Sequence, residues 1–458
     1  MYTLSSKLKL TAIIFMIVGA IGLIYGFIAA PSTLEEVEEM MAAEAHHGGG
    51  HSEEASHETT THDIETTHNA SEQTHNETAT GDNHVSDSHE VSHAEHVFHQ
   101  LQNKPWAAVY VAAFFFFMIP LGVLAFYAIQ FAAQAGWSPV LFRVMEGITA
   151  YLLPGSLIMF ALLLLSGFHL NHLFVWMDPE VVAHDELIQG KTGFLNVPFF
   201  LIRAAIYIIG WNVFRNLLRK YSLKQDESDN NSYYKKSFRL AAGFLVFFIV
   251  TESMMSWDWI MSFDPHWFST LFGWYVFASM FVSGITVIAL VTIYLKSRGY
   301  LEYVNNSHIH DLAKFMFGIS VFWTYLWFSQ FMLIWYSNIP EEVTYFITRI
   351  DDYNLPFFGM LVLNFIFPIL VLMNSDYKRV NWFVVMAGVA ILVGHYIDIF
   401  NMVMPATVGG SWFIGIPEIS AVLFFGGLFV LVVFTALTKV PLVPKRNPYL
   451  KESKHFHY

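Results

Sequence analysis

Residues 106–133 read WAAVYVAAFFFFMIPLGVLAFYAIQFAA, a stretch that contains no charged side chain. A helix that crosses the hydrocarbon core of a bilayer, which is about 30 Å thick, needs roughly 20 apolar residues. The four consecutive phenylalanines at 114–117 do not alternate with polar residues, as the strand of a membrane barrel would require. Because lipid admits only helices and closed barrels, this segment predicts a transmembrane helix.

Nine further stretches have the same length and character. Charged residues make up 13% of the 458-residue chain, against about 25% in soluble domains, which excludes an ordinary soluble protein. The first stretch is too long for a signal peptide, so we expect it to be retained. We therefore expect an all-α polytopic membrane protein with ten transmembrane helices. The stretches run approximately over 10–30, 106–133, 144–167, 194–213, 238–259, 268–295, 312–336, 355–373, 382–400 and 419–437.

The distribution of basic residues predicts the orientation. If the N-terminus is cytoplasmic, 20 of the 24 Lys and Arg residues fall on the cytoplasmic side. Only Lys104, Lys191 and Arg349 then fall on the outer side, and Arg203 lies within a helix. Cytoplasmic segments carry the excess of Lys and Arg in membrane proteins, so both termini are predicted to be cytoplasmic.

An acidic, histidine-rich tract separates the first two predicted helices. Residues 31–103 contain 16 Asp and Glu, 12 His and no Lys or Arg, so the remaining residues sum to +3 of the net −13. Such a composition cannot bury a core, and we expect the tract to be disordered or loosely docked on a partner. A solvated linker, weak metal binding by imidazoles between His46 and His99, and pH sensing remain alternative functions.

The expected organisation follows from these two patterns. An N-terminal helix (1–30) precedes the outer, periplasmic tract (31–104). A nine-helix membrane domain (105–440) and a cytoplasmic tail (441–458) follow.

The chain offers few ligands for a redox cofactor. It has no cysteine, which excludes disulfides, thiolate-held iron–sulfur clusters and c-type haem attachment. His395 is the only histidine expected well within a span, whereas a membrane b-type haem needs two axial ligands. We therefore predict no cofactor and no assured metal in this chain. The orientation of the helices in the membrane accounts for the distribution of Lys and Arg, so no nucleic-acid partner is expected.

Ionisable residues within spans are costly and are candidate functional sites. Arg203 and Glu252 lie at similar depth on consecutive helices, and we expect them to pair, for packing or for proton transfer or ligand binding. His395 and Asp398 are three residues apart and share a helix face. The polar residues concentrate in the outer half of the bilayer, and Glu146 is the exception in the inner half. The candidates for an outward-facing proton path are Glu252, Asp258, His395, Asp398, Arg203, Gln330 and Glu418.

Other polar residues lie just beyond the helices on the outer side. Asp264 and His266 fall in a loop, and His169 and His172 fall at the outer end of the third helix. These four residues are candidates for docking outer-side subunits. Each of them is also consistent with an ordinary polar residue at the membrane interface whose hydrogen bonds are satisfied. Aromatic residues such as Trp323 fit packing or an interface belt better than a quinone pocket.

Two segments resemble a known family. Thr251–Tyr275, TESMMSWDWIMSFDPHWFSTLFGWY, and Trp323–Glu342, WTYLWFSQFMLIWYSNIPEE, are similar to the NrfD/polysulfide-reductase-like membrane subunits of bacterial alternative complex III. The second segment, an aromatic helix that runs into an Asn-x-Pro-Glu-Glu turn, is the more specific. Of the two paralogous membrane subunits in that complex, the chain resembles the second, or ActF, type over roughly residues 100–440.

The resemblance implies a fold and a role. The fold is two four-helix bundles (about 105–263 and 268–400) with one extra helix at each end of the chain, the last at 418–437. The subunit holds no cofactor, while its periplasmic partners carry iron–sulfur clusters and multiple c-type haems. The assembly, in the bacterial inner membrane, oxidises quinol and reduces cytochrome c or an attached haem–copper oxidase. The quinol site beside the iron–sulfur subunit is ascribed mainly to the first paralogue.

Two rival functions remain open at this point. One is a secondary transporter, for a metal ion, with the histidine-rich tract as an outer collector. Pro120, Pro154 and Pro368 do not fall in matching halves, and the membrane midplane offers only Arg203, both of which argue against a transporter fold. The other is a purely architectural subunit that anchors peripheral proteins. Under each of these functions, the respiratory subunit included, we do not expect the chain to catalyse a reaction by itself.

Overall fold

The computed structural model describes residues 2–39 and 84–457, and for residues 84–96 it describes the backbone only. These residues form helices and no β-strand, and the prediction of ten membrane-spanning helices is confirmed. The spans, by length and composition, are Ser6–Ile28, Val97–Ala132, Pro139–Gly167, Val197–Glu227, Ser232–Phe263, Phe272–Ser297, Asn306–Ser337, Asn354–Leu372, Asn381–Thr407 and Ile416–Leu437.

The chain divides into two compact units. One comprises Met1–Ala29 together with Asn103–Tyr458, and the other is Ala30–Gln102. In the second unit the described residues form a helix over 34–39 and the beginning of helix α3 (His84–Ala132). Most of the histidine tract predicted as a weak metal site, residues 46–83, lies outside the described residues. The first unit carries the membrane domain.

Eight of the ten spans of the membrane domain can be described as two groups of four consecutive helices, here called the first and second bundle. Within each bundle consecutive helices pack side by side, and a π-helical turn joins α13 to α14. The first bundle contains α3, α4 (Phe142–Ile148) with α5 (Leu152–Gly167), α8 (Val197–Glu227) and α9 (Ser232–Trp259). The second contains α10 (Phe272–Ser297), α11 (Asn306–Ser337), α13 (Asn354–Leu361) with α14 (Phe367–Leu372), and α15 (Asn381–Thr407).

The two bundles meet along α3 and α10. In the apolar windows of these two helices 89% of the residues are buried, against 17% in α1 (Ser6–Ile28). Gly284 of α10 lies so close to α3 that a Cβ atom there would be 2.8 Å from the backbone nitrogen of Val123. Small residues permit such close approach between membrane helices, so Gly284 sets the spacing between the bundles.

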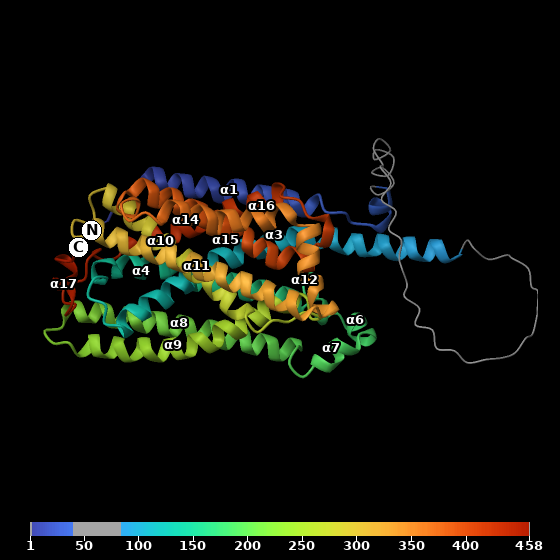
Figure 1. Cartoon of the computed structure of the whole chain (residues 1–458), viewed down its shortest axis with the longest axis horizontal. Coiled ribbons are helices and arrows are strands. Elements are labelled where there is room, and N and C mark those ends of the chain that lie inside the picture. Colours follow the sequence, from blue (N-terminus) through green and yellow to red (C-terminus); the bar gives the residue numbers. More distant parts are fainter. Residues whose placement is uncertain (1, 40–83, 458) are drawn as a thin grey trace, which may run out of the picture. The chain divides into compact units, whose positions relative to one another are not determined.

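The first and last long helices form a pair outside the bundles. Helix α1 packs along α16 (Ile416–Leu437), and Figure 1 shows them side by side at one edge of the domain. A Cβ atom at Gly19 would lie 2.6 Å from the carbonyl oxygen of Ser420, so this contact also depends on a glycine. Each end of the chain thus contributes one extra helix to a single two-helix layer.

Both termini lie at the same end of the membrane domain, which we call the termini end (Figure 1). There Thr3 bonds the hydroxyl of Tyr300 at 3.1 Å, and Ser453 of α17 (Leu450–Lys454) donates to the carbonyl of Trp137 at 2.6 Å. The short helices α6 (Pro179–His184), α7 (Glu186–Lys191) and α12 (Pro340–Asp351) lie at the opposite end, the α12 end.

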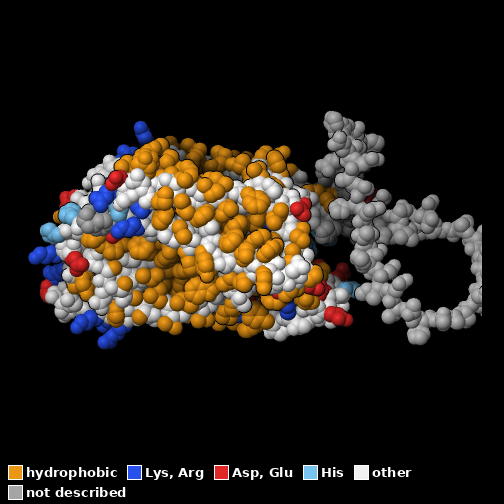
Figure 2. Space-filling view, viewed as in Figure 1, with side chains coloured by type: hydrophobic (Ala, Val, Ile, Leu, Met, Phe, Trp, Pro, Cys, Tyr) orange, Lys and Arg blue, Asp and Glu red, His pale blue; other side chains and the backbone are white. Residues whose placement is uncertain are grey.

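Figure 2 shows how the surface of this domain is divided. On the face shown, hydrophobic side chains cover a broad band across the middle, and Lys and Arg side chains gather at the termini end. This is the charge asymmetry on which the predicted cytoplasmic location of the termini depends.

Helix α11 begins earlier than expected. The side chain of Asn305 accepts hydrogen bonds from the backbone N–H groups of Ser307 and His308, which fixes the first turn. The span therefore includes His308 and His310 in its first turns, both buried near the termini end, whereas His395 lies well within its span. The helix ends at the left-handed residue Asn338, with φ of 49°.

Candidate functional site

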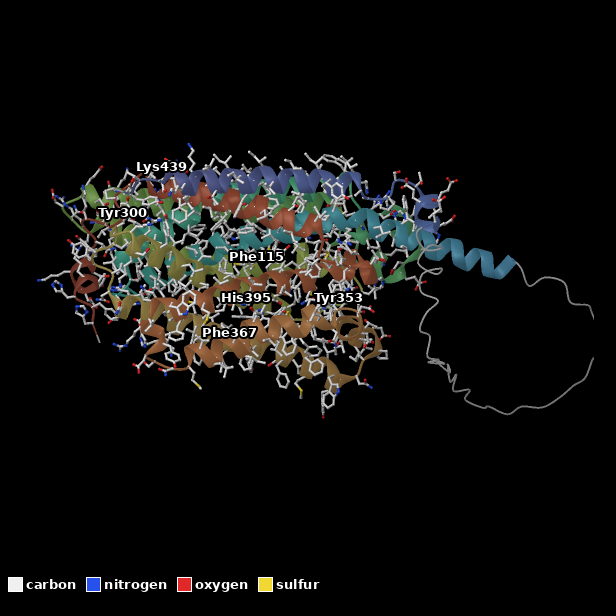
Figure 3. All side chains as sticks on the ribbon, turned by 90° about the horizontal axis from the view of Figure 1, so that it is seen from above. Phe115, Tyr300, Tyr353, Phe367, His395 and Lys439 are labelled. Atoms are coloured by element: carbon white, nitrogen blue, oxygen red, sulfur yellow. The ribbon has the colours of Figure 1, made fainter. Side chains whose placement is uncertain are left out.

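A buried polar cluster lies inside the second bundle, on α15. His395 and Asp398 are one helical turn apart, and His395 Nδ1 is 3.3 Å from Asp398 Oδ2. Both side chains are fully buried. Figure 3 shows His395 partway along the domain, between Tyr300 toward the termini end and Tyr353 toward the α12 end.

Asp398 accepts hydrogen bonds from two other helices of the bundle. The hydroxyl of Tyr275 on α10 donates to Oδ1, and the indole Nε1 of Trp323 on α11 donates to Oδ2 at 2.9 Å. The rings of Tyr275 and Trp323 also stack, with centroids 5.8 Å apart. Asp398 therefore ties α10, α11 and α15 together through donors that are neutral.

His395 is held by two further polar groups. Ser279 Oγ on α10 lies 2.9 Å from Nδ1, and Asn364 Nδ2 lies 3.5 Å from the same atom. Asn364 sits in the π-helical turn over Val362–Ile366, a local irregularity that is common at functional sites. His395 Nε2 is buried and has no hydrogen-bond partner in the described part of the chain.

This arrangement can hold one proton in two ways. The pair has zero net charge either as a neutral imidazole beside a protonated Asp398 or as an imidazolium beside a carboxylate. None of the ion pairs found among the described residues joins Asp398 to Lys or Arg. Proton exchange with His395 therefore requires no break of a bond to a fixed cation.

A small cavity continues from this cluster toward the α12 end. It has a volume of about 10 Å³, roughly the space that one water needs, and its walls include Tyr275, Gln330 and Arg349. Arg349 of α12 donates to the carbonyl of Tyr345 at 2.7 Å and to that of Asn401 at 3.1 Å. Burial lowers the pKa of the Arg349 guanidinium. Tyr275 thus touches both Asp398 and this cavity.

Arg203 pairs with Asp258 rather than with Glu252, so the expected Arg203–Glu252 pair is wrong. Arg203 Nε and Nη2 donate to the two carboxylate oxygens of Asp258 at 2.9 and 2.7 Å, and Tyr207 donates to the same group at 3.0 Å. The guanidinium also lies 3.9 Å from the ring of Phe194. Every charge here has a partner, which is the arrangement of a structural ion pair.

The other two carboxylate candidates lie apart from both clusters. Glu252 of α9 faces a separate pocket and belongs to none of the ion pairs between described residues. Glu418 Oε2 accepts a 2.8 Å hydrogen bond from the backbone N–H of Gly415 and so caps α16. The seven proton-path candidates therefore do not form one continuous path; His395, Asp398 and Gln330 belong to the second-bundle cluster and its cavity.

The docking candidates lie at the α12 end. His266 Nε2 is 2.6 Å from Oδ2 of Asp185, and Asp264 shares a surface groove with Lys191. Helix α5 ends at Gly167, so His169 and His172 lie in the loop after it and not in the third helix as expected.

Glu146, the one polar residue expected in the inner half of the bilayer, belongs to a buried network at the termini end. Arg143 contacts Glu146 at 2.7 Å and Asp226 at 2.5 Å. Tyr127 and Ser222 donate to the second oxygen of Glu146 at 2.8 and 2.5 Å. This network joins α3, α4 and α8, and each of its acidic groups has a basic partner.

Comparison with known proteins yields no family model that matches the chain, and no curated protein matches it.

Several residues of the cluster are not predicted as site residues. Tyr275 and Trp323 lie within the two segments that carry the family resemblance, but as aromatic residues they fit packing equally well. Ser279 and Asn364 carry no sequence signal that separates them from other polar residues within spans. Arg349 is expected only as an outer basic residue, and its burial against Tyr345 follows from the fold of α12.

Proposed function

We propose that this chain is a membrane subunit of a quinol-oxidising respiratory assembly of the alternative complex III type. In this proposal it holds no redox cofactor, provides the membrane scaffold, and exchanges protons through the His395–Asp398 cluster. The quinol site of the assembly lies mainly in a paralogous membrane subunit. Electrons pass through periplasmic partners with iron–sulfur clusters and c-type haems to cytochrome c or a haem–copper oxidase.

One observation carries the proposal. The two segments that resemble the family, Thr251–Tyr275 and Trp323–Glu342, each supply one hydrogen-bond donor to Asp398, namely Tyr275 and Trp323. A buried carboxylate within membrane-spanning helices is a functional site by default, because its burial is costly. The segments that carry the resemblance thus also supply the donors of the buried polar cluster in the second bundle.

The direction of proton exchange follows from the small cavity beside Tyr275. From Asp398, polar groups continue through Tyr275 to Gln330 and Arg349 at the α12 end. In the proposed orientation, with both termini on the cytoplasmic side of a bacterial inner membrane, the α12 end is periplasmic. Asp264 and His266 at this end are then placed to contact the periplasmic subunits, and lipid surrounds the apolar band.

The first test is the composition of the native assembly. The tagged chain is purified in mild detergent, its partners are identified by mass spectrometry, and an absorption spectrum is taken of the same sample. We expect an iron–sulfur protein, a multihaem c-type cytochrome and a paralogous membrane subunit. A colourless chain that purifies alone or as a homo-oligomer contradicts the proposal and favours the transporter, for which metal uptake is the next assay.

The second test addresses the proton cluster. Asp398→Asn keeps the shape of the side chain but cannot release a proton. In the intact assembly reconstituted in vesicles, we expect this variant to lower quinol-driven proton release by at least about tenfold. The control Asp351→Asn changes an exposed aspartate at the α12 end and should leave proton release unchanged. Unchanged proton release and quinol turnover in Asp398→Asn would exclude this role.

A further inference from the structure

A pocket of about 200 Å³ lies between α9 and α10, with its floor on α3. Its floor and walls include Ala125, Phe248 and Glu252, which are 0%, 2% and 3% exposed. At its mouth Ile249 and Trp274, which belong to membrane-spanning helices, are 54% and 50% exposed. The pocket therefore opens sideways toward the lipid, at a boundary between the two bundles.

Glu252 is the single ionisable residue among those that line this pocket. Its Oε1 atom is buried and has no hydrogen-bond partner among the described residues, and Oε2 has only a marginal contact of 3.5 Å from Ser253 Oγ. A buried polar atom without a partner costs roughly 1–3 kcal/mol in a protein. Such a group is expected to gain a partner when a ligand that donates a hydrogen bond enters the pocket.

The size and the walls of the pocket restrict that ligand. A cavity of about 150 Å³ admits benzene, so this pocket has room for one substituted six-membered ring. Phe248, Phe277 and Trp274 provide aromatic walls, against which a flat ring packs edge to face or offset. The side entrance selects molecules that dissolve in the bilayer.

We infer that this pocket binds a lipid-soluble phenol-type ligand, a single aromatic ring whose hydroxyl donates a hydrogen bond to Glu252. The inference requires binding only and does not depend on the proposed respiratory function. The site is separate from the Asp398 cluster, since the lining residues of the pocket do not include the residues that contact Asp398.

The test uses 4-bromophenol and 4-bromoanisole as probes. They share the ring and the bromine, but in the anisole a methyl group replaces the hydroxyl hydrogen. The full chain in lipid nanodiscs is titrated with each probe, and quenching of tryptophan fluorescence by bromine is followed. Partition into lipid gives quenching that rises linearly, so binding is the saturable part. Trp274→Phe should remove most of the saturable signal, which locates the site.

For the unchanged protein we expect saturable binding of 4-bromophenol and about tenfold weaker binding of 4-bromoanisole. Glu252→Leu should weaken 4-bromophenol binding by about tenfold, because it removes the acceptor. Glu252→Gln keeps an acceptor oxygen and should restore most of the affinity. Val246→Leu changes an exposed residue of the same helix outside the pocket and is the matched control.

Two results would overturn the inference. One is quenching by 4-bromophenol that is linear throughout, with no saturable part. The other is equal affinity for 4-bromophenol in the unchanged protein and in Glu252→Leu, with both proteins eluting as single folded species. Ala125→Leu provides an independent check, because it fills the floor of the pocket and should abolish binding while Glu252 is retained.

Discussion

The indole Nε1 of Trp323 donates a 2.9 Å hydrogen bond to Oδ2 of Asp398, and this bond joins α11 to α15 within the second bundle. A membrane helix surrounded by lipid gains little from apolar contact, so a buried hydrogen bond of this kind contributes both stability and register. The bond also positions the carboxylate beside His395.

Trp323→Phe should therefore destabilise the protein by about 1–3 kcal/mol, because a buried carboxylate oxygen loses a donor. Trp327, one turn further along α11, has an Nε1 without a partner among the described residues and offers a matched control. Titration with SDS in mixed micelles measures both variants. Equal losses in Trp323→Phe and Trp327→Phe would show that ring size, rather than the hydrogen bond, decides the effect.

Arg203→Leu should cost about 3–5 kcal/mol, since it leaves the buried Asp258 carboxylate without its cation. The double variant Arg203→Leu with Asp258→Leu removes both charges and should be more stable than Arg203→Leu alone. Asp258→Leu alone supplies the fourth corner, and the same unfolding titration of all four proteins completes the double-mutant cycle. Strictly additive losses would argue against coupling between the two side chains.

The segment between α6 and α8, which contains α7, should loosen in acid. The backbone N–H of Ile188 donates to Asp185 and lowers the pKa of that carboxyl, and the contact with His266 acts in the same direction. Because the folded-state pKa lies below the ordinary value of about 3.9, the stabilisation is fully present above pH of about 4. It is lost as the pH falls through the folded-state pKa.

Pepsin, which is active in acid, can follow this change. Cleavage within residues 185–196 should accelerate as the pH falls from about 4 toward 2, and Asp185→Asn should be cleaved faster already at the upper end of that range. Glu186→Gln changes the neighbouring exposed acid and should keep the pH dependence of the unchanged protein. Equal cleavage profiles for Asp185→Asn and the unchanged protein would contradict the assignment.

Gly284→Ala should destabilise the domain by about 1–3 kcal/mol, because its Cβ would press on the backbone of α3. Gly318 on α11 faces open space, and no atom lies within 4 Å of a Cβ placed there. Gly318→Ala should stabilise by about 0.5–1 kcal/mol through helix propensity alone. Thermal unfolding in detergent compares the two, and a gain at both positions would mean that α3 and α10 can separate.

The sequence predicts the helices of this protein well and the contacts between their polar residues poorly. Spans are predicted because apolar length is a property of the chain itself, whereas the start of α11 is not, because its first turn depends on the cap at Asn305. The sequence favours Glu252 as the partner of Arg203 only because the two residues lie at a similar depth in the bilayer. The six residues from Glu252 to Asp258 correspond to about 9 Å along the helix and a different face, and only packing decides which face meets α8.

Trp323 shows the other reason why part of the site was missed. Its sequence context, beside Tyr325 and Trp327, is that of an interface belt, and nothing in the sequence distinguishes the one indole N–H that meets a carboxylate. His395 and Asp398 were identified because ionisable residues within spans are rare. Their neutral partners were not identified, because Ser, Asn, Tyr and Trp are common in membrane helices.

The pairing of α1 with α16 has a consequence for biosynthesis. From Ile28 to Ile416 the ribosome must add 388 residues before the partner of the first helix begins to emerge. At roughly 5–20 residues per second, α1 waits about 20–80 s in the membrane without the helix that covers its glycine face. A nascent chain halted before α16 would therefore present Gly19 and its neighbours to any other helix nearby, and membrane insertion factors would have to shield this face until translation ends.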